Sequence, residues 1–273
     1  MEKAKKDHRF DFYNSLKPQK NYFAENYKHL KNEQRYDYIY LSKQAGCLDG
    51  KKILDSACAT GDLLDYVSRE NSHCFGFDYS KPFIYTANKS KPHNHNYAVC
   101  NAEYISFKSE SFDVVFSSHF VEHLYEDELL KYLKEVRRNL KPSGKIVVHT
   151  CPNKWYRYTV YRFYSRWIRM VLYPFLNLFF KNKISQIPSM DEFKKQDLQK
   201  KENKLIHVNE KSVRGLKNSL LNAGFEDTKV WAFGEPFKFN LWALPIYIVD
   251  LLYPLPKIFP VLFANHVWAV GTK

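Results

Sequence analysis

The hydrophobic and polar positions of residues 50–150 alternate in a way that predicts an α/β fold. Apolar runs have the length of strands over 51–57, 73–78, 96–102, 112–119 and 144–150. Amphipathic segments have helical spacing over 61–70, 80–90 and 126–144, and Pro142 and Gly144 are the stop signals of the last one. Strands that are almost wholly apolar and alternate with helices are typical of a buried parallel sheet.

Three additions enlarge this core, and the first contains a predicted helix over 22–44. They are an N-terminal helical extension, a basic amphipathic insertion and an apolar, proline-containing insertion, over 1–45, 152–206 and 236–262. The alternation resumes with a helix over 209–225 and strands over 226–233 and 266–273. We therefore expect a single domain over 1–273 rather than two domains.

The turn after the first strand has small residues at every second position. Ala57, Ala59 and Gly61 let the backbone pass close to a ligand, and the helix that follows offers free N–H groups. Asp78 ends the next strand, where a carboxylate in a doubly wound sheet accepts hydrogen bonds from ribose hydroxyls. Small residues would also suit tight strand–helix packing, but Asp78 at this position favours a nucleoside site.

These segments resemble the motifs of class I S-adenosylmethionine-dependent methyltransferases, of the type 11 and quinone-biosynthesis O-methyltransferase kind. Residues 53–61, ILDSACATG, are similar to the motif D-x-G-x-G-x-G, and residues 76–80, GFDYS, to the ribose-binding loop. Residues 100–107, CNAEYISF, are similar to the segment beside the adenine. The resemblance implies a Rossmann-like sheet of seven strands, mostly parallel with an antiparallel last strand, and helices on both faces. It implies that S-adenosylmethionine contacts Asp55, Ala57, Ala59, Gly61, Asp78, Tyr79, Asn101, Ala102, Glu103 and Ser118.

Three positions depart from the family pattern. Ala57 and Ala59 stand at two of the three glycine positions, and each adds a methyl group near the methionine moiety of the cofactor. Asn101 replaces an acidic residue and changes the donors and acceptors offered to the adenine edge. The G-x-G-x-x-G spacing of nicotinamide-dependent dehydrogenases is absent, so that class of enzyme is less favoured.

His119, Glu122 and His123 follow the fourth strand in an H-x-x-E-H string. Inverted zinc peptidases carry this string inside a helix, and its place at a strand end argues against a peptidase. The quinone O-methyltransferases carry a similar E-x-x-E-H string that is implicated in metal binding, with Glu at the position of His119. Three roles stay open: a structural cap of the next helix, catalysis by proton transfer or acceptor orientation, and, least favoured, ligation of a divalent metal.

Charge and aromatic content point to an anionic partner. The 42 basic and 29 acidic residues give a net charge of +13, and aromatics make up 17% of the chain. Residues 154–183 contain no acidic residue, and a helix over 157–172 would place Arg162, Arg166 and Arg169 opposite an aromatic and aliphatic face. We expect 154–183 and 236–262 to contact an anionic membrane surface. The runs of Leu, Ile and Val in both make nucleic acid a less favoured partner.

The remaining sequence features concern compartment and acceptor. Five cysteines without a C-x-x-C pair argue for a reducing compartment, and the polar N-terminus is unlike a signal peptide. The sequence thus predicts a cytoplasmic methyltransferase, peripheral on the inner face of a membrane, that methylates an oxygen of a lipophilic or membrane-linked acceptor. The alternatives are a small-molecule or sugar methyltransferase with a closed lid, an RNA methyltransferase, and a non-catalytic protein that binds the cofactor.

Overall fold

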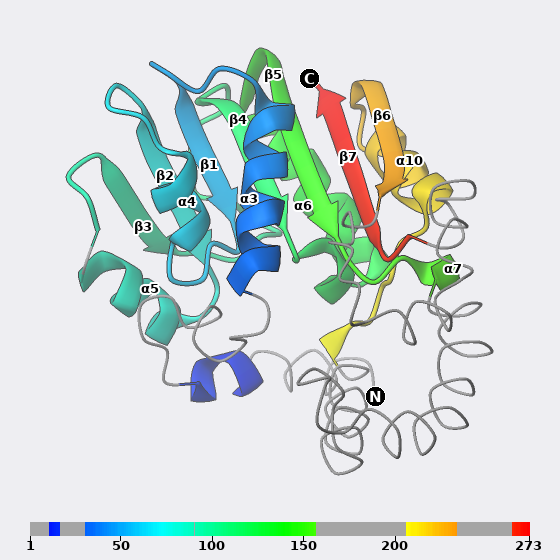
Figure 1. Ribbon diagram of the computed structural model, residues 1–273, viewed down its shortest axis with the longest axis horizontal. Helices are drawn as coiled ribbons and strands as arrows, with labels where there is room; N and C mark the ends of the chain where they lie inside the picture. Colours follow the sequence, from blue (N-terminus) through cyan, green and yellow to red (C-terminus); the bar gives the residue numbers. More distant parts are fainter. Residues whose placement is uncertain (1–10, 17–30, 90, 157–205, 234–263) are drawn as a thin grey trace, which may run out of the picture.

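A seven-stranded sheet forms the centre of the protein, as the computed structural model shows for residues 11–16, 31–89, 91–156, 206–233 and 264–273 (Figure 1). The strand order is β3-β2-β1-β4-β5-β7-β6. The first four pairs, from β3 to β5, are parallel, whereas β7 is antiparallel to both β5 and β6. The strands are β1 (Lys52–Ser56), β2 (His73–Asp78), β3 (His95–Val99), β4 (Phe112–Ser118), β5 (Leu140–Thr150), β6 (Glu226–Phe233) and β7 (His266–Thr272).

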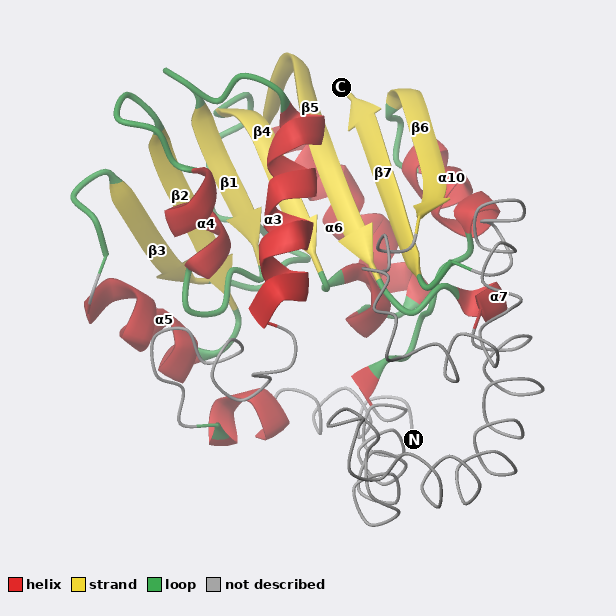
Figure 2. Cartoon of the chain, viewed as in Figure 1, coloured by secondary structure: helices red, strands yellow, loops and turns green. Residues whose placement is uncertain are grey.

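Helices cover both faces of the sheet and divide the core into two layers. Figure 2 shows α3 and α4 in front of the sheet, and α6 and α10 behind it. Buried Leu41 of α3 and Leu64 of α4 belong to one apolar cluster, and Leu133 of α6 and Leu220 of α10 belong to the other. The helices are α3 (Lys31–Ala45), α4 (Asp62–Val67), α5 (Lys81–Lys89), α6 (Glu126–Asn139), α7 (Lys154–Tyr156) and α10 (Val213–Asn222).

The predicted fold class is confirmed, including the antiparallel last strand. The predicted boundary between the helix over 126–144 and the next strand was wrong: the helix ends at Asn139, and β5 begins at Leu140. Leu140 is fully buried and pairs with Phe112, beside a shift in the register of β4 and β5. Burial of this leucine in the sheet therefore ends the helix before Pro142 and Gly144 are reached.

Three sequence predictions fall, wholly or in part, on residues that are not described. The amphipathic helix expected over 157–172 and the apolar insertion over 236–262 lie outside the described residues, and so does the start of the helix expected over 22–44. Among the helices that are described, none has the length and apolar character needed to cross a membrane.

The order of the strands reverses at β1, and this reversal marks where a ligand would bind. From β1 the chain proceeds outward to β2 and β3, and then returns to β4 on the other side of β1. In doubly wound sheets the ligand crevice lies outside the carboxyl ends of the strands at such a switch point. These ends point toward the lower part of Figure 1, where the helical residues 11–15 also lie.

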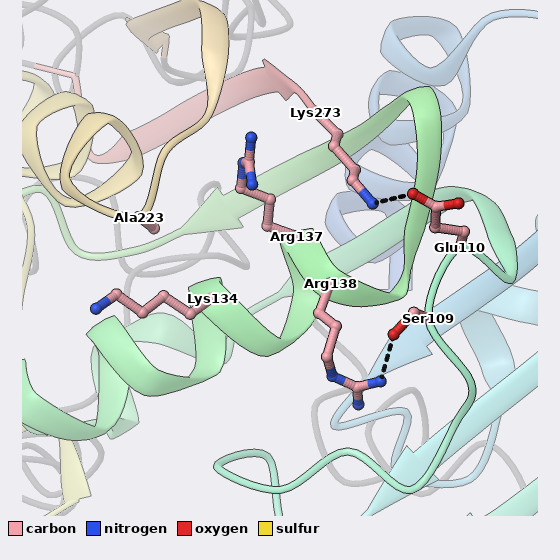
Figure 3. Close-up of a pocket in the computed structure, with 7 residues that line it drawn as sticks. All are labelled: Ser109, Glu110, Lys134, Arg137, Arg138, Ala223 and Lys273. Carbon is pink, nitrogen blue, oxygen red and sulfur yellow. Dashed lines mark hydrogen bonds and ion pairs between the residues drawn. The ribbon is translucent and has the colours of Figure 1, made fainter.

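A hollow lies at the other end of the parallel strands, near the last turn of α6 and the end of β7 (Figure 3). Three of the four cations that line it have partners inside the fold. Arg137 donates to the carbonyl oxygen of Gly224, Arg138 binds Glu135 and three groups between residues 105 and 109, and Lys273 binds Glu110. These contacts tie α6 and the chain end to the sheet, so we assign this hollow a structural role.

Gly61 is where the chain turns from β1 into α4, and the fold leaves no room there for a side chain. Its φ of 83° lies in the left-handed region, and a Cβ atom would stand 2.3 Å from the hydroxyl oxygen of Tyr97. Tyr97 lies on β3 and is itself buried, with its hydroxyl 3.1 Å from Nδ1 of His95. The tyrosine therefore closes the space that any larger residue at position 61 would need.

We expect Gly61→Ala to lower the free energy of unfolding by about 3 kcal/mol, from backbone strain and overpacking together. Gly50→Ala is the matched control, because Gly50 also has a positive φ, of 66°, but nothing lies within 4 Å of its Cβ position. It should cost about 1 kcal/mol, from strain alone. Urea denaturation measures both, and equal losses would show that Tyr97 does not constrain the turn.

Candidate functional site

The candidate site lies at the carboxyl ends of β1, β2 and β4. Ser56, the last residue of β1, pairs with Phe77 of β2 and with Ser117 of β4. Asp78 and Ser118 each come one residue later, so the sheet register brings the turn after β1, the acidic end of β2 and the end of β4 to one level. The structure thus collects at one edge the segments that the sequence proposed for the cofactor.

The turn after β1 follows an unusual backbone path. Ala57, Ala59 and Gly61 all have positive φ, at 55°, 47° and 83°. Such values favour glycine, and the two alanines adopt them under strain. The backbone N–H of Ala59 donates to a carboxylate oxygen of Asp78 at 3.0 Å, and that of Cys58 donates to the carbonyl oxygen of Phe77 at 2.9 Å. The turn is therefore held against the end of β2, with its backbone rather than side chains lining the crevice.

Acidic side chains concentrate beside this turn without a cation among them in the described residues. Burial raises the pKa of Asp78 to about 6, although backbone N–H groups of Ser80, Ala59 and Tyr79 act in the opposite direction. Burial, together with the charges of Asp78 and Asp62, raises the pKa of Asp55 well above its usual range. A ligand with hydroxyl groups and positive charge would satisfy both carboxyls. A ribose attached to a sulfonium and an amino group has this character.

The loop after β3 lies beside the end of β2. The backbone N–H of Cys100 donates to the carbonyl oxygen of Asp78, so this loop lies against the acidic end of β2. Asn101 accepts the backbone N–H of Glu103 through its side-chain oxygen, which leaves its NH₂ group to face a base. Glu103 forms an ion pair with Lys131 at 2.7 Å, and Ala102 is buried. Of the three, Asn101 has the chemistry best suited to recognising a base.

Two further predicted cofactor residues differ in their surroundings. Tyr79 is 41% exposed directly after Asp78, so part of its ring is available for a planar ligand. The hydroxyl oxygen of Ser118 is buried at the end of β4 and has no hydrogen-bond partner among the described residues. A bound ligand that reaches the end of β4 would supply that partner.

His119 occupies a strained and well-defined position at the end of β4. Its φ is 50°, and its backbone N–H donates to the carbonyl oxygen of His149 on β5. Nε2 lies 3.3 Å from a carboxylate oxygen of Asp37 on α3, while Nδ1 lies 3.5 Å from the sulfur of Cys151 and 3.7 Å from Glu122. The imidazole side chain is 43% exposed, so one part of it remains accessible beside the crevice.

The pKa values of this cluster favour a positive charge on His119. Burial lowers its pKa, but the charge of Cys151 and the hydrogen bonds of the ring with Asp37, Cys151 and Glu122, in which the carboxylates accept, outweigh this and raise it well above 6.5. For Glu122, burial is likewise outweighed by His119, His123 and His207, which lower the pKa to about 2. Glu122 is 1% exposed and also accepts the hydroxyl of Thr150 at 2.7 Å. At neutral pH the pair is an imidazolium and a carboxylate.

His123 faces a different set of groups. Val121–His123 forms a single 3₁₀ turn, not the α-helix that a zinc peptidase requires. His123 Nδ1 lies 3.1 Å from the carbonyl oxygen of Ile206, and its ring stacks edge-on to His207 at 4.8 Å. Glu122 comes within ligand distance of His119 with Cys151, and separately of His123 with His207. The three residues of the H-x-x-E-H string thus divide between two clusters that share Glu122.

Behind His119 lies a layer of aromatic rings that no sequence motif indicated. His149 Nε2 and His266 Nδ1 lie 2.8 Å apart, and Trp268 stacks on His149 at 3.9 Å. Burial lowers the pKa of both histidines, so they are neutral and pack as flat polar rings under the site. Asp37 was also missed, because it lies 82 positions before His119 and no local motif connects them.

The N-terminal residues contribute contacts that no pattern had indicated. The side chain of Ser80 donates to the carbonyl oxygen of Tyr13 at 3.0 Å, and the backbone N–H of Lys81 donates to the side-chain oxygen of Asn14 at 3.2 Å. The ring of Tyr13 meets that of His123 at 6.0 Å. Residues 11–16 therefore bridge the acidic end of β2 and the histidine cluster.

Comparison with known families supports a methyltransferase domain. Residues 54–148 match the family model described as "Methyltransferase domain". A ubiquinone biosynthesis O-methyltransferase of Bradyrhizobium diazoefficiens is 31% identical over 116 residues, which are 41% of this chain and 45% of the relative. The chain spans about half the length of the curated relatives that it matches.

Solved structures confirm the fold over a larger part of the chain. A methyltransferase from Haloferax volcanii, solved with its Trm112 activator, has a TM-score of 0.59 at 13% identity and covers 90% of this chain and 92% of its own. An S-adenosylmethionine-dependent methyltransferase from Archaeoglobus fulgidus has a TM-score of 0.55 at 19% identity, with coverages of 92% and 98%. At these identities the likeness establishes the class I methyltransferase fold.

The buried pair of Glu122 and His119 should make stability depend on pH. Because the pKa of Glu122 is lowered in the folded state, its contribution is present above pH 4.5 and is lost as pH falls toward 2. We expect the difference in unfolding free energy between wild type and Glu122→Gln to shrink by about 2 kcal/mol from pH 5 to pH 3. Denaturant titrations at each pH measure it, with Glu70→Gln as an exposed control. A difference that is constant with pH would contradict the pairing.

Proposed function

This chain contains a class I S-adenosylmethionine-dependent methyltransferase domain, and from that premise we propose that the protein methylates an oxygen of a lipophilic or membrane-linked acceptor. The observation that carries the proposal is the crevice itself: a strained small-residue turn hydrogen-bonded to Asp78 on one side, and His119 on the other. The first half suits a nucleoside cofactor, and the second suits an acceptor that becomes negatively charged.

The residues at the first half would hold the cofactor. Asp78 would accept the ribose hydroxyls, and Asn101 would face the adenine through its amide. Asp55 would face the positively charged methionine end, which would lower its pKa from the raised value. S-adenosylmethionine supplies a methyl group already activated on a sulfonium sulfur, so alignment of the acceptor accounts for much of the rate.

The residues at the second half would prepare the acceptor. With a pKa well above 6.5, His119 is a hydrogen-bond donor and a positive charge rather than a general base. Such a group stabilises the oxyanion of a phenolic or enolic acceptor, whose proton passes to solvent. Asp37 and Glu122 fix the imidazolium from two sides. This arrangement favours acceptor activation over the purely structural role for His119.

Support for an oxygen acceptor of lipophilic character comes from the relatives. Several curated proteins that match this chain are ubiquinone biosynthesis O-methyltransferases, among them one from Coxiella burnetii at 28% identity. The basic and apolar composition of 154–183 and 236–262 is what a protein needs to reach an acceptor held in an anionic membrane. We therefore propose a peripheral location at the inner face of a membrane.

Binding of S-adenosylhomocysteine should weaken as Asp78 becomes protonated. Since its pKa is about 6 in the folded protein, calorimetric titration should give about tenfold weaker binding at pH 5 than at pH 7. Asp78→Asn should bind about 10- to 100-fold more weakly at pH 7 and lose this pH dependence. Asp227→Asn, at an exposed position at the start of β6, is the control. Wild-type affinity in Asp78→Asn would remove Asp78 from the cofactor site.

Flotation with liposomes tests the membrane proposal. Wild type should float with vesicles that contain anionic phosphatidylglycerol and remain unbound with neutral phosphatidylcholine, because binding needs both charge and apolar contact. The variant with Arg162, Arg166 and Arg169 replaced by Glu should lose flotation while it keeps its affinity for S-adenosylhomocysteine. If wild type binds the nucleoside but never floats, the membrane proposal fails.

A further inference from the structure

Cys151 has a different environment from the other cysteines. Cys58, Cys74 and Cys100 are buried in the two apolar layers, and Cys47 is exposed at the end of α3 without a hydrogen bond in the described part of the chain. Cys151 directly follows β5 and is partly exposed, beside the exposed face of His119. It is thus the cysteine that combines access with a polar partner.

Cys151, His119 and Asp37 come from distant parts of the chain and lie in a row. The sulfur of Cys151 lies 3.5 Å from Nδ1 of His119, and Nε2 of the same ring lies 3.3 Å from a carboxylate oxygen of Asp37. A nucleophile beside an imidazole ring that a third group orients is an arrangement found in covalent catalysts. Asp37 is buried and comes from α3, so its carboxylate has a fixed direction.

The titratable groups around Cys151 come from four elements. Asp37 of α3 and Glu122 of the 3₁₀ turn face the His119 ring, while His149 of β5 and His266 of β7 lie behind it in neutral form. His119 is then the positive charge among two carboxylates and the thiol. A neighbouring imidazolium favours the thiolate, which is the reactive form of cysteine.

We propose that Cys151 is a nucleophilic thiol, activated by His119 with Asp37 as the positioning residue, and that it is a site of covalent modification by soft electrophiles. The thiol proton passes to solvent, and the positive charge of His119 stabilises the thiolate that remains. The sulfur then forms a bond to the electrophilic carbon, and the leaving group departs with the electron pair of the broken bond. An adduct on Cys151 would lie beside His119 and obstruct the proposed acceptor side. The thiol chemistry itself needs no methyl transfer, so it can succeed or fail independently of the proposed function.

Alkylation with iodoacetamide, followed by peptide mass spectrometry, tests the proposal on the full chain. The reagent forms an S–carbon bond and releases iodide. We expect Cys151 to react at least tenfold faster than Cys47 at pH 6.5, with a rate that changes little up to pH 8, whereas the rate at Cys47 should rise with pH. Comparable rates at the two cysteines, with the same pH profile, would overturn the proposal.

Two variants test the roles of the partners. His119→Gln should slow alkylation of Cys151 at least tenfold at pH 6.5, and Asp37→Asn should shift its pH profile toward that of Cys47, while Cys47 is unchanged in both. Continued protection of Cys58 and Cys74 shows that a variant is folded. Wild-type rates and pH profiles in both folded variants would overturn the proposal. So would reaction of wild-type Cys151 only after EDTA treatment, since His119, Glu122 and Cys151 would then hold a metal ion.

Discussion

The pairing of β4 with its two neighbours is the constraint on which both halves of the site depend. Ser117 of β4 is paired with Ser56 of β1, and Ser118 is paired with His149 of β5. The first pairing brings the end of β4 level with the turn after β1. The second brings His119 level with Thr150 and Cys151. Since backbone hydrogen bonds set this register, a slip of one residue would turn every side chain at the edge to the opposite face.

Electrostatics distinguishes the two halves more sharply than shape does. On the β1 side, Asp55 and Asp78 are buried with no cation of the described residues paired to them, and the pKa of each carboxyl is raised. On the β5 side, Glu122 is equally buried, but His119 lies beside it and the pKa of its carboxyl is lowered. Burial disfavours the charged carboxylate in both halves, but a neighbouring positive charge offsets this effect only on the β5 side. A positively charged cofactor suits the first half, and an acceptor that becomes an oxyanion suits the second.

Site residues that lie close together in the sequence could be predicted, whereas those that lie far apart could not. The turn at Ala57, Ala59 and Gly61 could be found because its small residues and Asp78 lie within about 20 positions in a fingerprint with a physical cause. Asp37, Cys151 and His266 could not be found, because they meet His119 and His149 only through contacts between elements far apart in the chain. The charge of His119 was equally hidden, since it results from three neighbours and not from the residue type.

By itself, the sequence determined the alternation of strands and helices, the parallel core, and the turn of small residues after β1. These features depend on hydrophobic periodicity and on local backbone geometry, which short segments encode. The tertiary structure decided where α6 ends, because burial of Leu140 against Phe112 outweighs the downstream stop signals. It also decided the surroundings of the H-x-x-E-H string, whose residues divide between two clusters, and it raised the pKa of His119. The pKa of a histidine depends on which buried charges the fold brings within hydrogen-bonding distance.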